Sequence, residues 1–174
     1  EITRIDTRVA EALAGVVAVF TARDVPVNEY GLIMPDQPVL CGPGSGKPGA
    51  ERVRFIGDQV ALVVAETEEI AAQARDLIEV EYRDLPPVAT LEQALEEQTP
   101  VLHPDRDSNV FCHYRIRKGD IEAGFAQADV IISGEYDTPV QEHAYLQPEA
   151  GVSYMDEEGR VTVVVAGQWT HEDQ

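Results

Sequence analysis

Residues 59–82 read Gln-Val-Ala-Leu-Val-Val-Ala-Glu-Thr-Glu-Glu-Ile-Ala-Ala-Gln-Ala-Arg-Asp-Leu-Ile-Glu-Val-Glu-Tyr, and this stretch decides the fold class. Its near-continuous apolar run over 59–65 predicts a buried strand. Thr67-Glu68-Glu69 then begins a helix that continues to about residue 78, with apolar side chains on one face. Residues 79–82 alternate polar and apolar side chains, which predicts a half-buried strand.

Further helices and strands are predicted on both sides of this stretch. Before it we expect strands over 2–5 and 16–20, with a helix over 7–14 between them. After it we expect helices over 91–96 and 121–126, and strands over 113–118, 130–137, 151–155 and 160–166, the last two joined as a hairpin by residues 156–159. Because these elements interleave without regular βαβ spacing, we predict an α+β fold and not a doubly wound α/β sheet.

Residues 26–50 are rich in proline and glycine and predict a long loop, which by its length is either functional or disordered. Within it, Cys41 to Gly49 resembles a phosphate-binding loop. That motif requires glycine where Cys41 stands, and a serine or threonine hydroxyl where Pro48 stands. We therefore interpret this stretch as a mobile surface loop and not as a nucleotide site.

The composition excludes several kinds of partner. Thirty-two acidic and 13 basic residues give a net charge of −19, which argues against nucleic acid and against an anionic membrane surface. A hydrated surface explains the acidity, and an acidic docking face for another subunit is the alternative. Two cysteines form no metal-binding spacing, no apolar stretch is long enough to span a bilayer, and we predict a cytoplasmic location.

Polar side chains outside the loop offer a few candidate site residues. The run from Gln141 to Ala150 concentrates hydrogen-bonding groups between apolar strands, and a polar turn between domains is the alternative interpretation. Gln168 ends the last apolar strand, where it could serve only as a cap. His171-Glu172 follows a strand and lacks the second histidine of a zinc-protease helix, and His103 is expected to be solvated in a turn.

The last apolar run, 161–166, needs a sheet and a second layer to cover it, and only a few residues follow it. The chain also begins without methionine, in an apparent strand. We therefore expect this chain to be a piece of a larger polypeptide.

The order of several motifs resembles one family, the large molybdenum-binding subunit of the xanthine dehydrogenases and aldehyde oxidases. The similar segments are Asp6-Thr7, Leu13 to Asp24, Val53 to Thr67, Val80 to Pro86, Ala94-Leu95, Asn109, Gly119-Asp120, Ala128-Asp129 and Gln141 to Glu149. The resemblance covers nearly the whole chain except the loop. It implies an α/β hammerhead domain over 1–110, followed over 115–174 by a truncated mixed α/β segment that begins the molybdopterin-binding region.

The resemblance also implies a chemistry and its groups. Members of the family oxidise or hydroxylate a small heterocycle or aldehyde with water as the oxygen source, a glutamate as base, and electrons leaving through iron–sulfur clusters to flavin. Gln168, after Gly167, matches the glutamine beside the metal's oxo ligand, although Ala166-Gly167 replaces the Ser-Thr common in relatives. We expect Gln141, His143 and Glu149 to support the site without catalysing.

The catalytic glutamate is expected beyond residue 174, and no side chain here is expected to ligate the metal directly. The chain alone should therefore hold no cofactor and be inactive, while its parent would work with iron–sulfur and FAD-containing subunits or domains. Gln147 stands where many relatives have glutamate. A stand-alone hammerhead-type interaction module is the alternative, and a nucleotide-binding enzyme using Gly44 to Gly49 is a third hypothesis.

Overall fold

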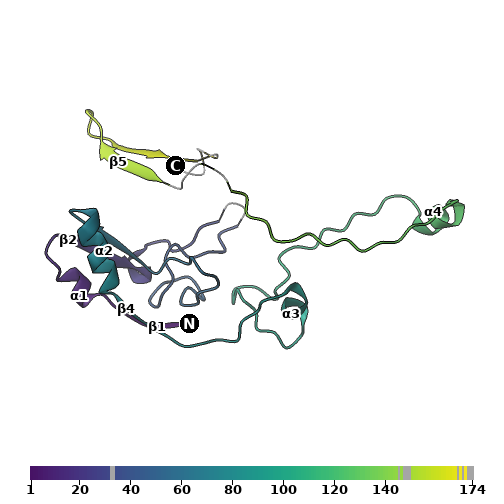
Figure 1. Ribbon diagram of the computed structural model, residues 1–174, viewed down its shortest axis with the longest axis horizontal. Helices are drawn as coiled ribbons and strands as arrows, with labels where there is room; N and C mark the ends of the chain where they lie inside the picture. Colours follow the sequence, from purple (N-terminus) through teal and green to yellow (C-terminus); the bar gives the residue numbers. More distant parts are fainter. Residues whose placement is uncertain (32–33, 145, 147–149, 168, 170, 172–174) are drawn as a thin grey trace. The chain divides into compact units, whose positions relative to one another are not determined.

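The computed structural model describes residues 1–31, 34–144, 146, 150–167, 169 and 171. Within these ranges the chain forms two-stranded antiparallel sheets and short helices, distributed over two compact units, Glu1–Tyr114 and Arg115–Gln174 (Figure 1). This mixture of helices and small antiparallel sheets confirms the predicted α+β class. The domain limits expected from the sequence, 1–110 and 115–174, stay a prediction.

The first unit holds two sheets of two strands each. β2 (Val16–Thr21) pairs with β3 (Ala61–Ala65), and a register shift between Val16 and Ala18 places a bulge in β2. β1 (Ile2–Asp6) pairs with β4 (Glu79–Tyr82), with a second register shift between Ile2 and Arg4. The β3, α2 and β4 segments of the deciding stretch therefore form as predicted, but β3 and β4 belong to different sheets.

The longest helix covers one face of the sheet formed by β2 and β3. α2 (Glu68–Asp76) begins where the Thr67 hydroxyl accepts a hydrogen bond from the Ile70 amide at 3.3 Å. It packs against β3, β2 and α1 (Arg8–Glu11), and it buries Ala74 completely. Alternate β3 residues are half-buried under the helix, whereas Leu62 on the opposite face is 54% exposed.

Two short elements complete the first unit. The 3₁₀ turn η1 (Ala22–Asp24) is held by the Asp24 carboxylate, which accepts hydrogen bonds from the amide and hydroxyl of Thr21 at 2.8 and 2.9 Å. α3 (Leu91–Leu95) begins where the Thr90 hydroxyl accepts a hydrogen bond from the Gln93 amide. The α1 helix is shorter than the predicted 7–14, because Gly15 with φ +89° turns the chain into β2.

The loop 26–50, whose part from Cys41 to Gly49 we interpreted as a mobile surface loop, supplies part of the core. Leu40, Cys41 and Ala50 are buried within it. Asn28, also buried, donates through Nδ2 to the Leu40 carbonyl and to Ser45 Oγ, and accepts through Oδ1 from the Leu40 amide, each at 2.9 Å. One carboxamide therefore replaces the backbone hydrogen bonds that a strand would have provided.

Residues 100–110 form a segment that packs against the loop. We call this segment the strap. Arg54 donates to carbonyl oxygens on both sides of the contact, those of Gly49, Arg52 and Leu102, each at 3.2 Å. Asn109 accepts from the Leu102 amide at 2.9 Å and donates to the carbonyls of Ala94 and Pro100 at 3.1 Å. The strap therefore belongs physically to the first unit.

The second unit contains α4 (Ile121–Gln127) and the hairpin formed by β5 (Gly151–Met155) and β6 (Val161–Val165). The strands predicted over 113–118 and 130–137 are wrong, since the structure gives no strand at either segment. Val130 and Ile132 are exposed, and an extended segment becomes a strand only when a neighbour takes up its backbone hydrogen bonds. No helix in the described part of the chain has the length and apolar character needed to cross a bilayer.

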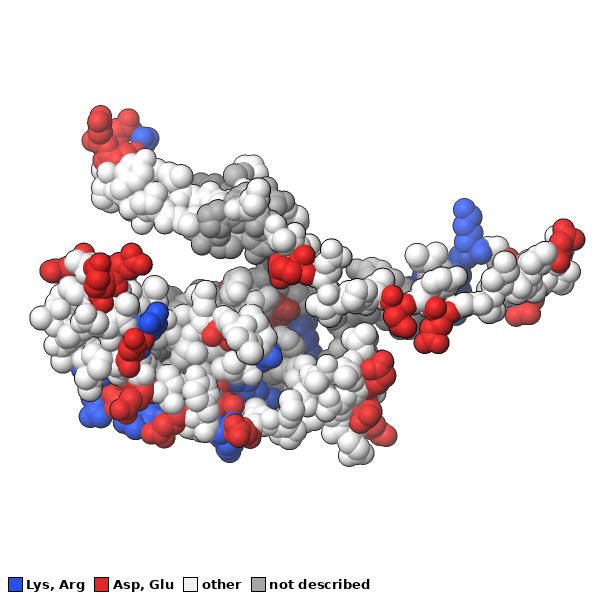
Figure 2. All heavy atoms as spheres, in the orientation of Figure 1, with Lys and Arg blue, Asp and Glu red and all other residues white. Residues whose placement is uncertain are grey.

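The hairpin is apolar on both faces. Cross-strand pairs place Val152 opposite Val164 on one face, and Met155 opposite Val161 on the other. The exposed fractions of its valines run from 52% for Val165 to 73% for Val161. Figure 2 shows an uncharged body along the hairpin and acidic groups concentrated at its tip, residues 156–160.

Candidate functional site

The open end of the hairpin brings together the segments that carry the predicted site residues. The Ala166 amide donates to the Ala150 carbonyl at 3.4 Å, which extends the ladder by one pair beyond β5 and β6. Gly167 follows directly and is exposed at this end. The antiparallel pairing thus sets the chain entering β5 beside the chain leaving β6. In the sequence, Gln168 follows Gly167 and Glu149 precedes Ala150. Both Gln168 and Glu149 lie outside the described residues.

The polar run that precedes the hairpin has an extended, irregular backbone. Gln141 and His143 are exposed. Ala144 has φ +51°, in the left-handed region that a residue with a Cβ rarely adopts, and its amide donates to Glu142 Oε1 at 3.5 Å. The run therefore bends sharply at Ala144. Tyr145, Gln147 and Pro148, which continue the run, lie outside the described residues.

The polar run and the open end of the hairpin offer hydrogen-bonding groups in the described part of the chain. In the run before the hairpin Gln141 offers a carboxamide and His143 an imidazole, and at the open end Gly167 offers a backbone without a side chain. No cluster of three or more His, Cys, Asp or Glu side chains that could hold a metal occurs in the ranges that the structure describes. Hydrogen-bonding side chains of this kind fit a group that is held by hydrogen bonds along its organic part.

The tip of the hairpin is a structural turn. The Asp156 carboxylate accepts from the amides of Glu158 and Arg160 and from the Arg160 guanidinium, at 2.8–2.9 Å. The Arg160 amide, followed by the Arg160 side chain, lowers the pKa of Asp156 below its usual range. Gly159, with φ +78°, closes the turn. The acidic tip therefore fixes the strand register and carries no arrangement for catalysis.

The phosphate-loop resemblance receives no support from the geometry of its lysine. The Lys47 side chain is only 7% exposed, and its Nζ donates to the Pro35 carbonyl at 3.0 Å and lies 3.5 Å from Glu29. The Ser45 hydroxyl accepts from the Lys47 amide and from Asn28. Both side chains are therefore engaged within the loop and hold its own backbone together.

The two isolated histidines take different positions. His103 is half-buried in the strap, and burial, followed by the charge of Arg54, lowers its pKa. His103 is therefore solvated in part and not fully. His171 lies in a turn near the end of the described chain, away from any helix, so it has no zinc-protease geometry.

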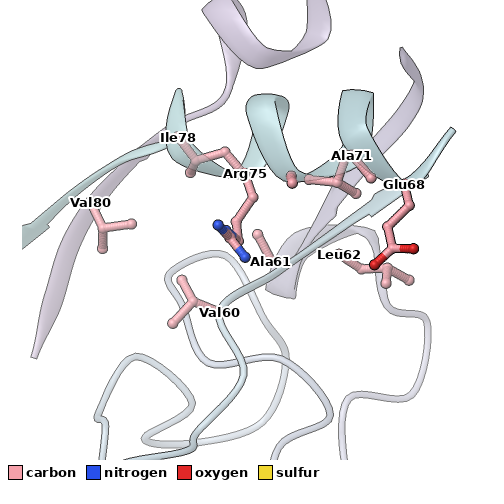
Figure 3. A pocket seen from close by; sticks show the side chains of 10 residues that line it. Val60, Ala61, Leu62, Glu68, Ala71, Arg75, Ile78 and Val80 are labelled. Carbon is pink, nitrogen blue, oxygen red and sulfur yellow. The ribbon is translucent and has the colours of Figure 1, made fainter. Parts of the chain in front are cut away.

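The sequence analysis missed a groove between α2 and the edge of β3. Its volume is about 510 Å³, and its walls are formed by Val60 to Val63, Glu68, Ala71, Ala72, Arg75, Ile78 and Val80. Figure 3 shows the side chains of Glu68 and Arg75 both extending from α2 toward β3, with Glu68 at one end of the groove and Arg75 near its middle. The spacing of Glu68, Ala71, Ala72 and Arg75, which is i, i+3, i+4 and i+7, is the signal that marks this helix face.

Family comparisons divide the chain in the order that the resemblance implies. Residues 1–86 match the family described as aldehyde oxidase and xanthine dehydrogenase, a/b hammerhead domain. Residues 102–174 match the molybdopterin cofactor-binding domain family. The second match begins within the strap, and the two together leave only a short stretch unassigned.

Whole-protein relatives extend beyond this chain. It is 39% identical, over 100% of its length, to a probable xanthine dehydrogenase subunit from Bacillus subtilis, of which it covers 22%. It is 37% identical, over 99% of its length, to the nicotinate dehydrogenase large molybdopterin subunit of Eubacterium barkeri, of which it covers 39%. The chain thus spans between about a fifth and two fifths of the length of these relatives.

Solved structures show the same correspondence. Quinoline 2-oxidoreductase from Pseudomonas putida matches 96% of this chain at a TM-score of 0.75 and 26% identity, with 21% of that structure covered. Aldehyde oxidoreductase from Desulfovibrio gigas matches 94% at a TM-score of 0.70 and 26% identity, with 18% covered. The hammerhead match is followed along the chain by the cofactor-domain match. The chain therefore belongs to the family of xanthine dehydrogenase and aldehyde oxidase large subunits.

Proposed function

We propose that this chain is part of the large subunit of a molybdenum hydroxylase that oxidises or hydroxylates a small heterocycle or aldehyde with water as the oxygen source. The observation that carries the proposal is the ordered pair of family matches, hammerhead domain and then molybdopterin-binding domain, over residues 1–86 and 102–174. Relatives named for xanthine and nicotinate dehydrogenation, and a solved aldehyde oxidoreductase, support the substrate class.

In this proposal the open end of the hairpin faces the cofactor. When bound, the molybdenum cofactor supplies the redox chemistry and the activation of water. Gln168, beside Gly167, would offer its carboxamide to the cofactor as a neutral hydrogen-bond donor. Gln141, His143 and Glu149 would support the site without catalysing.

The remaining assignments follow from the family. The proposed parent protein carries its catalytic glutamate outside this chain and transfers electrons to iron–sulfur and FAD-containing subunits or domains. We propose that it acts in the cytoplasm, and that residues 1–110 and 115–174 are separate domains of the large subunit. The chain alone, without the rest of the subunit, is expected to be inactive.

The stand-alone interaction module is the second candidate function. Such a module would be a monodisperse protein without a large exposed apolar patch. The hairpin, with Val161, Val163 and Val165 more than half exposed on one face, argues against it. An apolar strand of this kind is typical of a segment that other parts of a larger protein cover.

The proposal is tested in the parent protein by comparing wild type with Gln168→Ala. We expect molybdenum, measured by mass spectrometry, to stay at the wild-type level, because the carboxamide does not ligate the metal. Turnover of a purine and aldehyde panel should fall about 100-fold, the usual cost of removing a hydrogen-bond donor that acts in the transition state.

Gln127→Ala is the matched control, since it removes the same carboxamide from the exposed end of α4. It should retain full activity. A parent protein without molybdenum would overturn the enzymatic proposal and leave the interaction module. A loaded parent in which Gln168→Ala keeps wild-type turnover would overturn only the role of Gln168.

A further inference from the structure

The outer edge of β3 is unusually open for a strand edge. Among the described residues β3 pairs only with β2, so its other edge has backbone groups without a strand partner. Natural edge strands are commonly protected by lysine, proline or a bulge. Residues 60–65 contain no charged residue and no proline, and the bulge of this sheet lies in β2. This edge is therefore competent to pair with another strand.

The helix beside this edge presents a short stripe with a charge at each end. Glu68, Ala71, Ala72 and Arg75 all line the groove and occupy one face of α2 (Figure 3). Glu68 and Arg75 are exposed and lie two helical turns apart, about 10 Å along the axis. Arg75 also contacts the carboxylate of its neighbour Asp76 at 2.8 Å but stays 70% exposed. The stripe is therefore acidic at one end, basic at the other and small in the middle.

This stripe is complementary to a reversed copy of itself. Its centre falls between Ala71 and Ala72, so two antiparallel stripes place Glu68 of each chain opposite Arg75 of the other. The alanines then face each other, and small side chains allow helix axes to approach to about 8 Å. A two-fold axis perpendicular to the sheet produces this arrangement and simultaneously sets the two β3 edges antiparallel.

We propose that this groove is a homotypic interface, in which two copies of the chain join their β3 edges into one four-stranded antiparallel sheet. Both α2 helices lie on the same face of that sheet and are held by two Glu68–Arg75 ion pairs. The proposal is independent of the proposed enzymatic function, since it uses only residues of the first unit and no cofactor. A strand from a different protein could pair with the same backbone edge, but the two-fold symmetry of the charges favours a second copy.

Sedimentation equilibrium of the parent protein over increasing concentration, at low salt, tests the interface. Wild type should dimerise, and the single variants Glu68→Arg and Arg75→Glu should each weaken the dimer about 10- to 100-fold, because like charges then face each other at both ends. An equimolar mixture of the two variants should restore association, since each variant supplies the charge that the other lacks. High salt should weaken the wild-type dimer.

Glu69→Arg and Gln73→Glu are matched controls, because they change charge on the same helix but outside the stripe. Both should dimerise like wild type, and circular dichroism should show an unchanged fold for all variants. A wild-type parent protein that stays monomeric up to about 0.1 mM would overturn the proposal. So would a dimer in which the variant mixture fails to associate. A monomer whose β3 amides become protected from hydrogen exchange only with another subunit would assign the edge to that subunit instead.

Discussion

Burial and regular backbone structure usually occur together, but the loop 26–50 has only the first and the hairpin of β5 and β6 has only the second. The loop is irregular, yet Leu40 and Cys41 within it are 5% and 1% exposed. The hairpin has five consecutive cross-strand pairs, yet Val161 and Val163 are 73% and 62% exposed. Regular hydrogen bonding thus does not create a core, and a core does not require regular hydrogen bonding.

The difference has a physical cause in how each segment satisfies its backbone. In the loop, the buried polar groups of Leu40 are satisfied by a single side chain, that of Asn28. In the hairpin, the backbone groups satisfy each other, and the apolar side chains have nothing to pack against among the described residues. A two-stranded ribbon is only marginally stable without a second layer, so the two segments should respond very differently to substitution.

The largest expected difference between the loop and the hairpin is in the reactivity of a cysteine thiol placed in each. Burial, followed by the charge of Asp58, raises the pKa of Cys41 to about 11. In a chain with Cys112→Ser, Cys41 should react with a thiol reagent at pH 8 about 10²- to 10³-fold more slowly than a cysteine introduced by Val163→Cys. Stopped-flow absorbance measures both rates, and denaturant should equalise them. Similar rates in the folded chain would mean that the loop opens freely.

Removing the Asn28 side chain should cause the largest loss of stability. Asn28→Ala leaves the buried amide and carbonyl of Leu40 without partners, and we expect the free energy of unfolding to fall by about 2–4 kcal/mol. Urea unfolding followed by circular dichroism measures the change. Ser153→Ala, in the exposed hairpin, is the control and should stay within about 0.5 kcal/mol of wild type. A loss below about 1 kcal/mol for Asn28→Ala would contradict the role assigned to this carboxamide.

Acidification should loosen the hairpin tip while the loop stays intact. The lowered pKa of Asp156 means that the turn gains stability above the unfolded-state pKa and loses it as the pH falls through the lower folded-state pKa. The amide resonances of Glu158 and Arg160 should therefore titrate with a midpoint below the ordinary aspartate value. Asp156→Asn should abolish this transition. A midpoint at or above the ordinary value would contradict the hydrogen bonds described for the turn.

The smallest expected effect is that of an isosteric change on the hairpin. Val163→Thr would be costly in a packed core, because it buries a hydroxyl. On an exposed strand we expect the free energy of unfolding to change by less than about 0.5 kcal/mol. The same urea experiment measures it. A loss above about 1 kcal/mol would show that this face is covered in solution.

Sequence patterns predicted the elements whose causes are local. The stretch 59–82 forms two strands and a helix as predicted, because apolar periodicity and the Thr67 cap act within a few residues. The turn at Asp156 to Gly159 was predictable for the same reason. The burial of the loop was not, because it depends on Asn28 reaching residues 12 and 17 positions away.

The errors and the open questions also have physical reasons. Segments 113–118 and 130–137 carry strand-like residues, but β propensity cannot supply a partner strand, and none forms there. Gln168 and Glu149 were named from a family resemblance and lie outside the described residues, so their roles stay predictions. The open end of the hairpin, by contrast, follows directly from pairing that the sequence predicted.

At the strap, the boundary between family domains differs from the boundary between compact structural units. The cofactor-domain family match begins at residue 102, whereas the first compact unit extends to Tyr114. Evolutionary exchange or laboratory recombination at residue 102 would place a different strap against Arg54, which binds the Leu102 carbonyl, and would replace the Asn109 side chain that ties Ala94 to Pro100. An exchange made after residue 114 would keep these contacts. The family domain that begins at residue 102 and the compact unit that ends at Tyr114 therefore share the strap and the few residues that follow it.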